Sequence, residues 1–323
     1  MTNFWQNLQK PILALAPMEG VTDFAFREMF AKYGKPNVMF TEFVNVDGLL
    51  HPEGFERMKI NLQYTEAQRP IVAQIWGRDP GKFYKAAQII AQLKFDGVDI
   101  NFGCPQDKEI AQKTCAALIR EPELAGEIIS ATIKGAGGLP VSAKTRLGYS
   151  KPEEMKAWLE QLLKYNLAAI AIHARTKQEK SKVPARWGKI KEAVELRNQL
   201  RNSTLIIGNG DIKSRQEAME RIRETNCDGV MIGRGAFGNP WIFRRDGHQP
   251  SVKEKLQVML EHALLFEKTH KGLKSFATMR KNFKAYSTGF PGAHELRAKL
   301  METNSAEEVT KIVEEFNILN LEI

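Results

Sequence analysis

The chain has 323 residues, of which 43% are hydrophobic, and a formal net charge of +9. This length suits one barrel of roughly 250 residues with a smaller appendage. No apolar run approaches the ~18 residues of a membrane span, and the first residues lack the basic and apolar parts of a secretory signal. Its three cysteines fit neither a disulfide framework nor a zinc pattern, so we expect a cytoplasmic protein without a bound metal.

Short apolar runs recur along the first three quarters of the chain. Strands covered on both faces are continuously apolar, so each run predicts a buried parallel strand. The eight predicted strands lie at residues 12–17, 38–42, 71–74, 97–101, 141–144, 168–173, 205–209 and 229–233.

Helical patterns with start signals lie between several of these strands. Asp and Ser are good N-caps, and Pro is favoured in a first helical turn. We expect helices over residues 23–33, 79–93, 121 onward, 151–165, and from either Asp211 or Ser214 to about 226. Eight strands alternating with helices predict an α/β fold, a (β/α)8 TIM barrel with its active site at the C-terminal ends of the strands. A doubly wound open sheet is the alternative, but it needs neither eight such units nor functional residues after so many strands.

The strand pattern stops after Arg245. Residues 246–250 have the composition of a linker, and residues 251–323 show amphipathic helical patterns with breaks at Gly272 and at 289–292. We therefore predict a catalytic barrel domain at 1–245 and an all-α helical domain at 246–323.

Positive charge is concentrated in two segments. Residues 175–191 hold seven basic residues against Glu179, and residues 268–299 hold eight against Glu295. Each segment alone is equally well explained as a solvated lysine-rich face. Two such segments on one chain favour a nucleic-acid partner.

Glycine-containing turns follow the last two predicted strands, at 209–211 and 233–235. Glycine lets the backbone approach an anion, exposed N–H groups donate to it, and Arg234 can add a charge-assisted hydrogen bond. Either turn alone is commonly a plain strand-to-helix connection. Together, on the strands where barrels bind phosphate, they favour a bound phosphate group.

Other strands also end in chemically useful residues. Lys144 is costly to bury without an anionic partner, for which a reduced flavin ring is a candidate, although the side chain can also extend to solvent. Gln74 can pair with a heterocycle edge or with backbone, and His173 gains interest only from its position. Met18 offers a soft apolar surface after the first strand.

Cys104 follows the fourth strand in the segment 99–105. A thiol with an ordinary pKa of about 8.5 is mostly protonated at neutral pH and can donate a proton. A buried structural cysteine is the alternative, but the turn after the strand favours the rim. Cys115 and Cys227 lack such a context and are expected to be structural.

Together these elements resemble the tRNA-dihydrouridine synthases. The matching segments are residues 16–23, 74–77, 99–105, 144–148, 173–176, 209–211 and 233–235, with 279–281 and 289–292 in the tail. The resemblance implies an FMN enzyme that uses NADPH to reduce the C5–C6 bond of particular uridines in tRNA, with the uracil extruded into the pocket. Separately, we expect a monomer.

The resemblance also implies roles for individual residues. Cys104 is the implied general acid. The implied FMN-binding residues are Pro17, Met18, Glu19, Gln74, Lys144, His173, Asn209, Gly210, Asp211, Gly233 and Arg234. The implied substrate-binding residues are Asn101, Arg146, Arg175, Lys274, Arg280 and Lys281.

The chain departs from the family pattern in two places. Lys113 and Cys115 stand where members commonly have glycine, and Asn282 stands where histidine is frequent. These departures keep a non-catalytic tRNA-binding homologue open as an alternative. An FMN oxidoreductase acting on a small molecule is the other alternative, although it leaves the basic tail unexplained.

Overall fold

The computed structural model describes residues 3–320, with side chains described through residue 316. Its centre is a parallel sheet in the order β1-β9-β8-β7-β6-β5-β4-β2, with β3 also paired to β4. The strands are β1 (Ile12–Leu15), β2 (Met39–Phe40), β3 (Val44–Asn45), β4 (Ile71–Trp76), β5 (Gly97–Asn101), β6 (Val141–Arg146), β7 (Ala169–His173), β8 (Leu205–Asn209) and β9 (Gly229–Ile232).

The two ends of this sheet meet, which makes it a barrel. Ala14 of β1 forms a parallel bridge with Val38, the residue before β2. The backbone N–H of Leu15 donates to the Val38 carbonyl at 3.0 Å, and that of Asn37 donates to the Leu13 carbonyl at 2.8 Å. Because β2 and β3 both pair with β4, they share one barrel position. The predicted (β/α)8 barrel is confirmed, and the open-sheet alternative is wrong.

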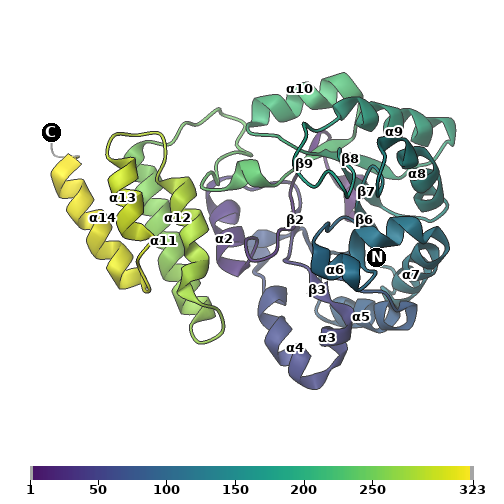
Figure 1. The fold of residues 1–323 in the computed structure, drawn as a ribbon, viewed down its shortest axis with the longest axis horizontal. Helices are drawn as coiled ribbons and strands as arrows, with labels where there is room; N and C mark the ends of the chain where they lie inside the picture. Colours follow the sequence, from purple (N-terminus) through teal and green to yellow (C-terminus); the bar gives the residue numbers. More distant parts are fainter. Residues whose placement is uncertain (1–2, 321–323) are drawn as a thin grey trace.

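Helices surround the barrel (Figure 1). They are α1 (Phe4–Asn7), α2 (Phe24–Tyr33), α3 (Val46–Leu50), α4 (Pro52–Met58), α5 (Pro80–Gln92), α6 (Asp107–Ala111), α7 (Pro122–Gly135), α8 (Met155–Leu163), α9 (Trp187–Gln199) and α10 (Arg215–Thr225). Asp23 caps α2 and Asp79 caps α5, as predicted, and Ser214 rather than Asp211 caps α10. The sequence gives no start signal for α9, because Arg186 makes no side-chain cap there.

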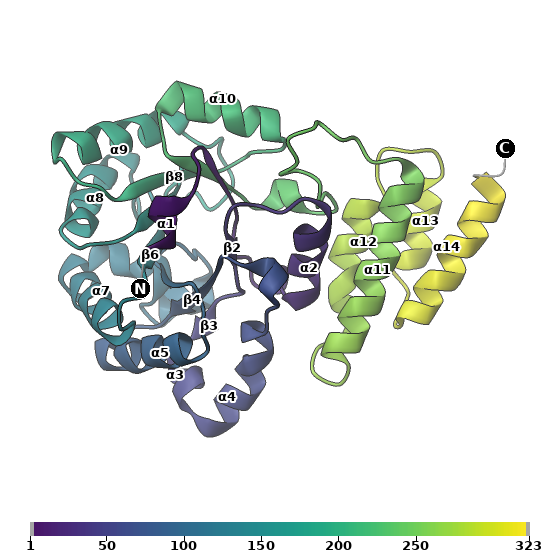
Figure 2. The same ribbon diagram turned by 180° about the vertical axis from the view of Figure 1, so that it is seen from behind.

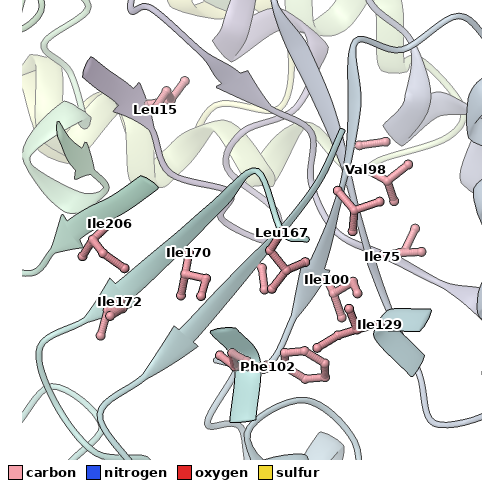
Figure 3. Packing of buried hydrophobic residues seen from close by; sticks show 14 of the residues in the cluster. Leu15, Ile75, Val98, Ile100, Phe102, Ile129, Leu167, Ile170, Ile172 and Ile206 are labelled. Carbon is pink, nitrogen blue, oxygen red and sulfur yellow. The ribbon is translucent and has the colours of Figure 1, made fainter. Parts of the chain in front are cut away.

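Alternate residues of β1 face two different hydrophobic clusters. Leu13 and Leu15 belong to a cluster shared with the surrounding helices, whereas Ile12 and Ala14 belong to one made mostly of strand residues. The second cluster therefore fills the barrel interior, which is a packed core and not a pore. Figure 3 shows part of the first cluster, where Ile100 of β5 lies near Ile129 of α7. Truncating one such buried Ile to Ala costs about 2–5 kcal/mol.

The chain ends in a group of helices beside the barrel. These are α11 (Val252–His270), α12 (Arg280–Tyr286), α13 (Ala293–Leu300) and α14 (Ala306–Asn320). Figures 1 and 2 both show them next to α2. Their hydrophobic cluster also includes Ala25 and Met29 of α2 and Trp241. A domain boundary at 245/246 therefore stays a prediction. No helix within residues 3–320 is long and apolar enough to cross a membrane.

Candidate active site

A cleft of about 630 Å³ opens at the C-terminal ends of the barrel strands. This volume lies within the usual range for a small-molecule site. The cleft gathers fourteen of the residues singled out from the sequence, which come from seven barrel positions. They are Pro17, Met18, Glu19, Gln74, Asn101, Cys104, Lys144, Arg146, His173, Asn209, Gly210, Asp211, Gly233 and Arg234.

A buried carboxylate lies beneath the cleft. The strand register places Asp99 of β5 between Gln74 of β4 and Ser142 of β6. The Asp99 carboxylate accepts hydrogen bonds from Gln74 Nε2 at 2.6 Å and from Ser142 Oγ at 2.5 Å. Burial raises the pKa of Asp99 to about 6. These bonds fix the Gln74 amide at the cleft, with its oxygen pointing the other way.

That oxygen starts a second chain of contacts, which holds the loop after β5. Asn101 Nδ2 donates to Gln74 Oε1 at 3.1 Å. Asn101 Oδ1 accepts from the backbone N–H groups of Gly103 and Cys104, both at 2.9 Å. An asparagine side chain that bonds the backbone two and three residues ahead fixes a turn. Asn101 therefore sets the conformation from which the Cys104 thiol meets the cleft.

Arg146 holds the same loop from the neighbouring strand. Its Nε donates to the Gly103 carbonyl at 2.7 Å, and its Nη1 donates to the carbonyls of Thr176 and Lys180 at 3.1 and 2.9 Å. The residue is 6% exposed, and burial lowers its pKa to about 10. Arg146 stays charged at neutral pH and ties the Cys104 loop to the loop after β7.

The thiol of Cys104 has a second thiol as its neighbour. Cys104 is half-buried at the cleft, whereas Cys115 is fully buried. A hydrogen bond from the Cys115 thiol lowers the pKa of Cys104, as does the backbone N–H of Gln106, while burial opposes both. The same hydrogen bond, together with burial, raises the pKa of Cys115 well above its ordinary value. Cys115 is therefore the donor, and Cys104 is the more acidic thiol.

Lys144 brings a positive charge into the cleft. Among the side chains that the structure describes, none accepts a hydrogen bond from its ammonium or forms an ion pair with it. Burial, together with the nearby Arg146, lowers its pKa to about 8, although the Asp99 carboxylate and Cys104 partly offset both effects. A half-buried ammonium without a hydrogen-bond partner predicts a polar or anionic group of a ligand at this place.

His173 is neutral in this structure. Burial lowers its pKa well below the ordinary value, and the nearby cations, Arg146 first, lower it further. Its Nε2 lies 3.0 Å from Nη1 of Arg175. Because a guanidinium only donates, Nε2 accepts, and the ring proton is on Nδ1. His173 therefore has a single ring N–H donor, on Nδ1.

The Asp211 carboxylate binds two arginines at the end of the cleft formed by the turns after β8 and β9. One carboxylate oxygen accepts from Arg175 and from the backbone N–H of Ala185, and the other accepts from Arg234 Nη2 at 2.9 Å. The Arg175 side chain is only 3% exposed, whereas that of Arg234 is 63% exposed. Arg234 can therefore reach a ligand, while Asp211 holds it in place.

The turns after the last two strands contain glycine, and the first of them requires it. Gly210 has a φ of +135°, which L-residues rarely adopt. A Cβ at Gly233 would lie 3.5 Å from the Met18 sulfur and 3.6 Å from the Ala16 Cβ, both of which line the cleft. The missing side chain thus leaves cleft space open next to Arg234. The volume and the positive charge of this cleft fit a phosphorylated ring cofactor.

Comparison with known proteins identifies the family. The family described as "Dihydrouridine synthase (Dus)" matches residues 14–321. The chain belongs to the dihydrouridine synthase family. A relative from Staphylococcus aureus (strain MRSA252), named probable tRNA-dihydrouridine synthase, is 41% identical over 97% of this chain and 95% of the relative. Probable tRNA-dihydrouridine synthase 2 from Bacillus subtilis (strain 168) is 42% identical over 97% of this chain and 96% of its own length.

A solved structure supports the barrel fold of this dihydrouridine synthase family member. Histamine dehydrogenase from Rhizobium sp. 4-9 superposes with a TM-score of 0.55, covering 77% of this chain and 48% of that chain. At 12% sequence identity, this likeness shows the fold alone.

Four of the predicted site residues of this dihydrouridine synthase family member lie outside the cleft lining. They are Arg175, Lys274, Arg280 and Lys281. Arg175 is 2% exposed and donates to the carbonyl of Val183 as well as to His173 and Asp211. It therefore supports the cleft from behind. Arg280 donates to Asn304 at 3.5 Å on the helical side.

Lys274 has a protein partner that the sequence does not reveal. Its ammonium donates to Glu42 Oε2 at 2.6 Å, and Glu42 Oε1 accepts from the backbone N–H of Gly20 at 2.6 Å. Glu42 is 2% exposed. Lys281, which is exposed, brings its Nζ within 3.1 Å of the position that a Cβ at Gly20 would occupy. Lys274 and Lys281 thus lie where the helical group meets the rim of the barrel.

The two basic segments differ in how many of their cations form ion pairs. In residues 175–191, four of the seven cations have acidic partners: Arg175 with Asp211, Lys180 with Asp107, Arg186 with Glu179 and Lys189 with Glu192. In residues 268–299, the exposed Lys268, Lys271, Lys281 and Lys284 form no ion pair with the described residues. The second segment is therefore the better candidate for contact with an anionic polymer.

Three residues of the site escaped the sequence reasoning. Cys115 was expected to be structural, yet its thiol contacts Cys104. A cysteine at a position where the family commonly has glycine was the available signal. Glu42 ends a predicted strand and Asp99 lies within one. A carboxylate inside an otherwise apolar run signals a buried polar contact, although the sequence does not name its partner.

Proposed function

We propose that this protein is an FMN-dependent tRNA-dihydrouridine synthase, which uses NADPH to reduce the C5–C6 bond of uridines in tRNA. Family membership supports the proposal, and so do the names of the relatives. The observation that carries it is one cleft that holds both the acidic thiol of Cys104 and the unpartnered ammonium of Lys144. We further propose that the protein is cytoplasmic and acts as a monomer.

The cofactor fits the residues present. Arg234 and the backbone around Gly233 would hold the phosphate, and Lys144 would donate to an acceptor on the ring. Gln74 and His173 would supply further donors, while Met18 would supply apolar contact. When bound, FMN supplies the hydride that reduces C6 of the uracil, after it has been reduced by NADPH.

Cys104 supplies the proton that C5 of the uracil must gain. Its lowered pKa makes the thiol a stronger acid than an ordinary cysteine. After transfer, the remaining thiolate keeps its hydrogen bonds from the Cys115 thiol and the Gln106 backbone N–H. Lys144 and Arg146 add favourable charge interactions with it. These four groups stabilise the negative charge left on the sulfur and so favour proton release.

The loop that carries Cys104 is held on three sides. Asn101 bonds its backbone N–H groups, Arg146 bonds the Gly103 carbonyl, and the N–H of Ala116 donates to the Cys104 carbonyl at 3.3 Å. A general acid must lie within hydrogen-bond reach of the atom that it protonates. We infer that Asn101 and Arg146 act by holding this loop in position rather than by contacting the uracil.

The tRNA partner is proposed to lie across the helical group and the rim of the cleft. A tRNA-sized polyanion gains most of its affinity from lysine and arginine contacts to phosphates. The exposed lysines of residues 268–284 provide such charge next to the rim. The target uracil must leave its stack to reach a cleft of about 630 Å³.

The decisive experiment uses the purified full chain, an unmodified tRNA transcript and NADPH. We expect a yellow protein with one FMN, and dihydrouridine in the nucleosides released from the tRNA. Free uridine and a small enone serve as control substrates. A colourless protein that still binds tRNA would point to a non-catalytic homologue. Enone reduction at a rate indifferent to tRNA, without dihydrouridine, would point to a small-molecule oxidoreductase.

A further inference from the structure

Two thiols meet at the rim of the cleft, and the proposed reaction uses only one of them. Cys104 is half-buried and lines the cleft. Cys115 is fully buried and donates a hydrogen bond to the Cys104 sulfur. The backbone bond from Ala116 N–H to the Cys104 carbonyl, 3.3 Å long, brings the two segments together. Solvent in the cleft therefore reaches the Cys104 sulfur, whereas the Cys115 sulfur is buried next to it.

Cys115 occupies a backbone conformation that disfavours it. Its φ is +53°, in the left-handed region, where an L-residue other than Gly, Asn or Asp is strained by about 1–2 kcal/mol. Glycine would adopt this conformation freely. The chain instead keeps a side chain there, and that side chain is a thiol that contacts the reactive sulfur. This strained placement is an observation independent of the thiol contact.

The surroundings of Cys104 favour attack on an oxidant. Thiolates, not thiols, react with peroxides, and low-pKa accessible cysteines beside a second cysteine are typical redox sensors. Lys144 and Arg146 lie close enough to Cys104 to interact with its charge. Cys227, the remaining cysteine, is 4% exposed, and its sulfur contacts the Gly229 carbonyl at 3.2 Å, away from the cleft lining. It serves as an internal control.

We propose that Cys104 and Cys115 form a reversible disulfide when a hydroperoxide enters the cleft, and that this disulfide switches the active site off. The Cys104 sulfur attacks the terminal peroxide oxygen, the O–O bond breaks, and a sulfenic acid forms. The other oxygen takes the proton that the Cys104 thiol gives up and leaves as an alcohol or water. The Cys115 sulfur then attacks the Cys104 sulfur. The S–O bond breaks, and the departing oxygen takes the Cys115 proton and leaves as water.

The balance of this sequence is two thiols oxidised by two electrons and one hydroperoxide reduced. In the disulfide, Cys104 has no thiol proton to donate to the uracil. The expected loss of activity therefore rests on the proposed function. The disulfide also protects Cys104, because a sulfenic acid without a nearby thiol proceeds to the sulfinic acid, which ordinary thiols do not reduce.

The test begins with thiol chemistry on the full-length reduced protein. After stoichiometric hydrogen peroxide, we expect two of the three cysteines to resist alkylation and the mass to fall by two hydrogen atoms. Trypsin cleaves after Lys113, between the two cysteines, so the disulfide joins two separate peptides. Dithiothreitol restores both thiols. Three alkylatable thiols after peroxide treatment would overturn the proposal, whatever the protein does to tRNA.

Two variants sharpen the test. Cys115→Gly suits the positive φ and preserves the fold, and in it we expect dimedone to trap Cys104 as a sulfenic acid that then proceeds to the sulfinic acid. Cys227→Ser should form the disulfide as the wild type does. Equal rates of sulfinic acid formation in the wild type and Cys115→Gly would also overturn the proposal. In the wild type, dihydrouridine formation should fall in proportion to the disulfide fraction and return with dithiothreitol. If the disulfide forms but the reduced protein produces no dihydrouridine in tRNA, the disulfide proposal stands and the proposed function is rejected.

Discussion

The ammonium of Lys274 lies 2.6 Å from the carboxylate of Glu42, a residue 232 positions earlier in the chain. Glu42 also accepts the backbone N–H of Gly20, which belongs to the loop after β1 at the rim of the cleft. The side chain of Glu42 is 3% exposed and that of Lys274 is 20% exposed. This pair therefore connects the helical group to the loop that carries Met18 and Glu19.

The first prediction concerns this pair. Lys274→Met keeps the apolar stem but leaves a buried carboxylate unpaired, which lowers the free energy of unfolding by about 3 kcal/mol. Chemical denaturation measures it. Lys284→Met, at an exposed position on α12, is the matched control and should change stability by less than about 0.5 kcal/mol. Unchanged stability with weakened tRNA binding in Lys274→Met would mean that this lysine contacts phosphate, as the sequence first suggested.

The second prediction separates Lys281 and Arg280 from Lys274. Neither Lys281 nor Arg280 has an acidic hydrogen-bond partner among the described residues. If each contacts one tRNA phosphate, the double change to Gln reduces the slope of log affinity against log salt by roughly 1 to 2. Titrations of tRNA at several salt concentrations measure this slope. Lys156→Gln, exposed on α8 of the barrel, should leave it unchanged. An unaltered slope in the double variant would restrict the helical group to packing.

Much of this architecture was predictable from local sequence, and Glu42 shows where predictability ends. Buried parallel strands are continuous apolar runs, so β1, β4 and β8 stand out, and the residues that end them fall at one rim. Asp79 and Ser214 predict the starts of α5 and α10, because each side chain caps its helix. The partner of Glu42 depends instead on how α11 and α12 dock beside α2, which no local pattern encodes.

The same distinction applies within the cleft. The sequence places Asp211 in a phosphate-type turn, but the structure uses its carboxylate to hold Arg175 and Arg234. The sequence treats Cys115 as structural because its neighbours are ordinary, whereas the loop closure that brings it to Cys104 depends on two positive-φ residues, Lys113 and Cys115. The sequence predicts which residues lie at the ends of the strands, but it does not predict which polar side chains pair across the loops.

The third prediction follows from the two arginines on Asp211. Arg234→Ala removes an exposed pair worth under about 1 kcal/mol, so stability is nearly unchanged. It also removes a charge-assisted hydrogen bond to the cofactor phosphate, so FMN affinity falls about tenfold or more. Asp211→Ala, by contrast, affects stability. The buried guanidinium of Arg175 loses its carboxylate partner, which lowers the free energy of unfolding by about 3 kcal/mol.

Flavin titration and chemical denaturation of both variants check this contrast. Arg223→Ala on α10, exposed and away from the cleft lining, is the control for losing an arginine. An Arg234→Ala protein that binds FMN as tightly as the wild type would show that Arg234 does not meet the phosphate.

The fourth prediction is a pH dependence at Lys144. Its pKa is about 8 before a ligand binds, because burial disfavours the ammonium. The ammonium makes a stronger hydrogen bond to a ring acceptor than the neutral amine does. FMN affinity therefore holds below about pH 8 and falls above it, by up to tenfold per pH unit, until the higher pKa of the complex is reached. Lys144→Gln should bind more weakly and show no such fall. A wild-type affinity that is flat through this range would exclude contact between the ammonium and the cofactor.

The last prediction tests Cys104 as the acid. Cys104→Ala should retain FMN, because no cofactor contact is assigned to the thiol, yet lose about 10² to 10⁴-fold in the rate of dihydrouridine formation. Only the protonated thiol gives a proton, so the wild-type rate falls as pH rises through the pKa of Cys104. That decline comes at a lower pH than it would for an ordinary thiol, because the Cys115 hydrogen bond lowers the pKa of Cys104.

Single-turnover reduction of tRNA by the prereduced enzyme measures the step without interference from NADPH oxidation. Cys227→Ala is the control for losing a thiol, since Cys227 is buried away from the cleft lining, and its rate should match the wild type. Cys104→Ser should remain slow, because a serine hydroxyl is a far weaker acid than a thiol. A Cys104→Ala enzyme with an undiminished rate would require another proton source in the cleft, and His173, whose ring proton is on Nδ1, would then be the first residue to substitute.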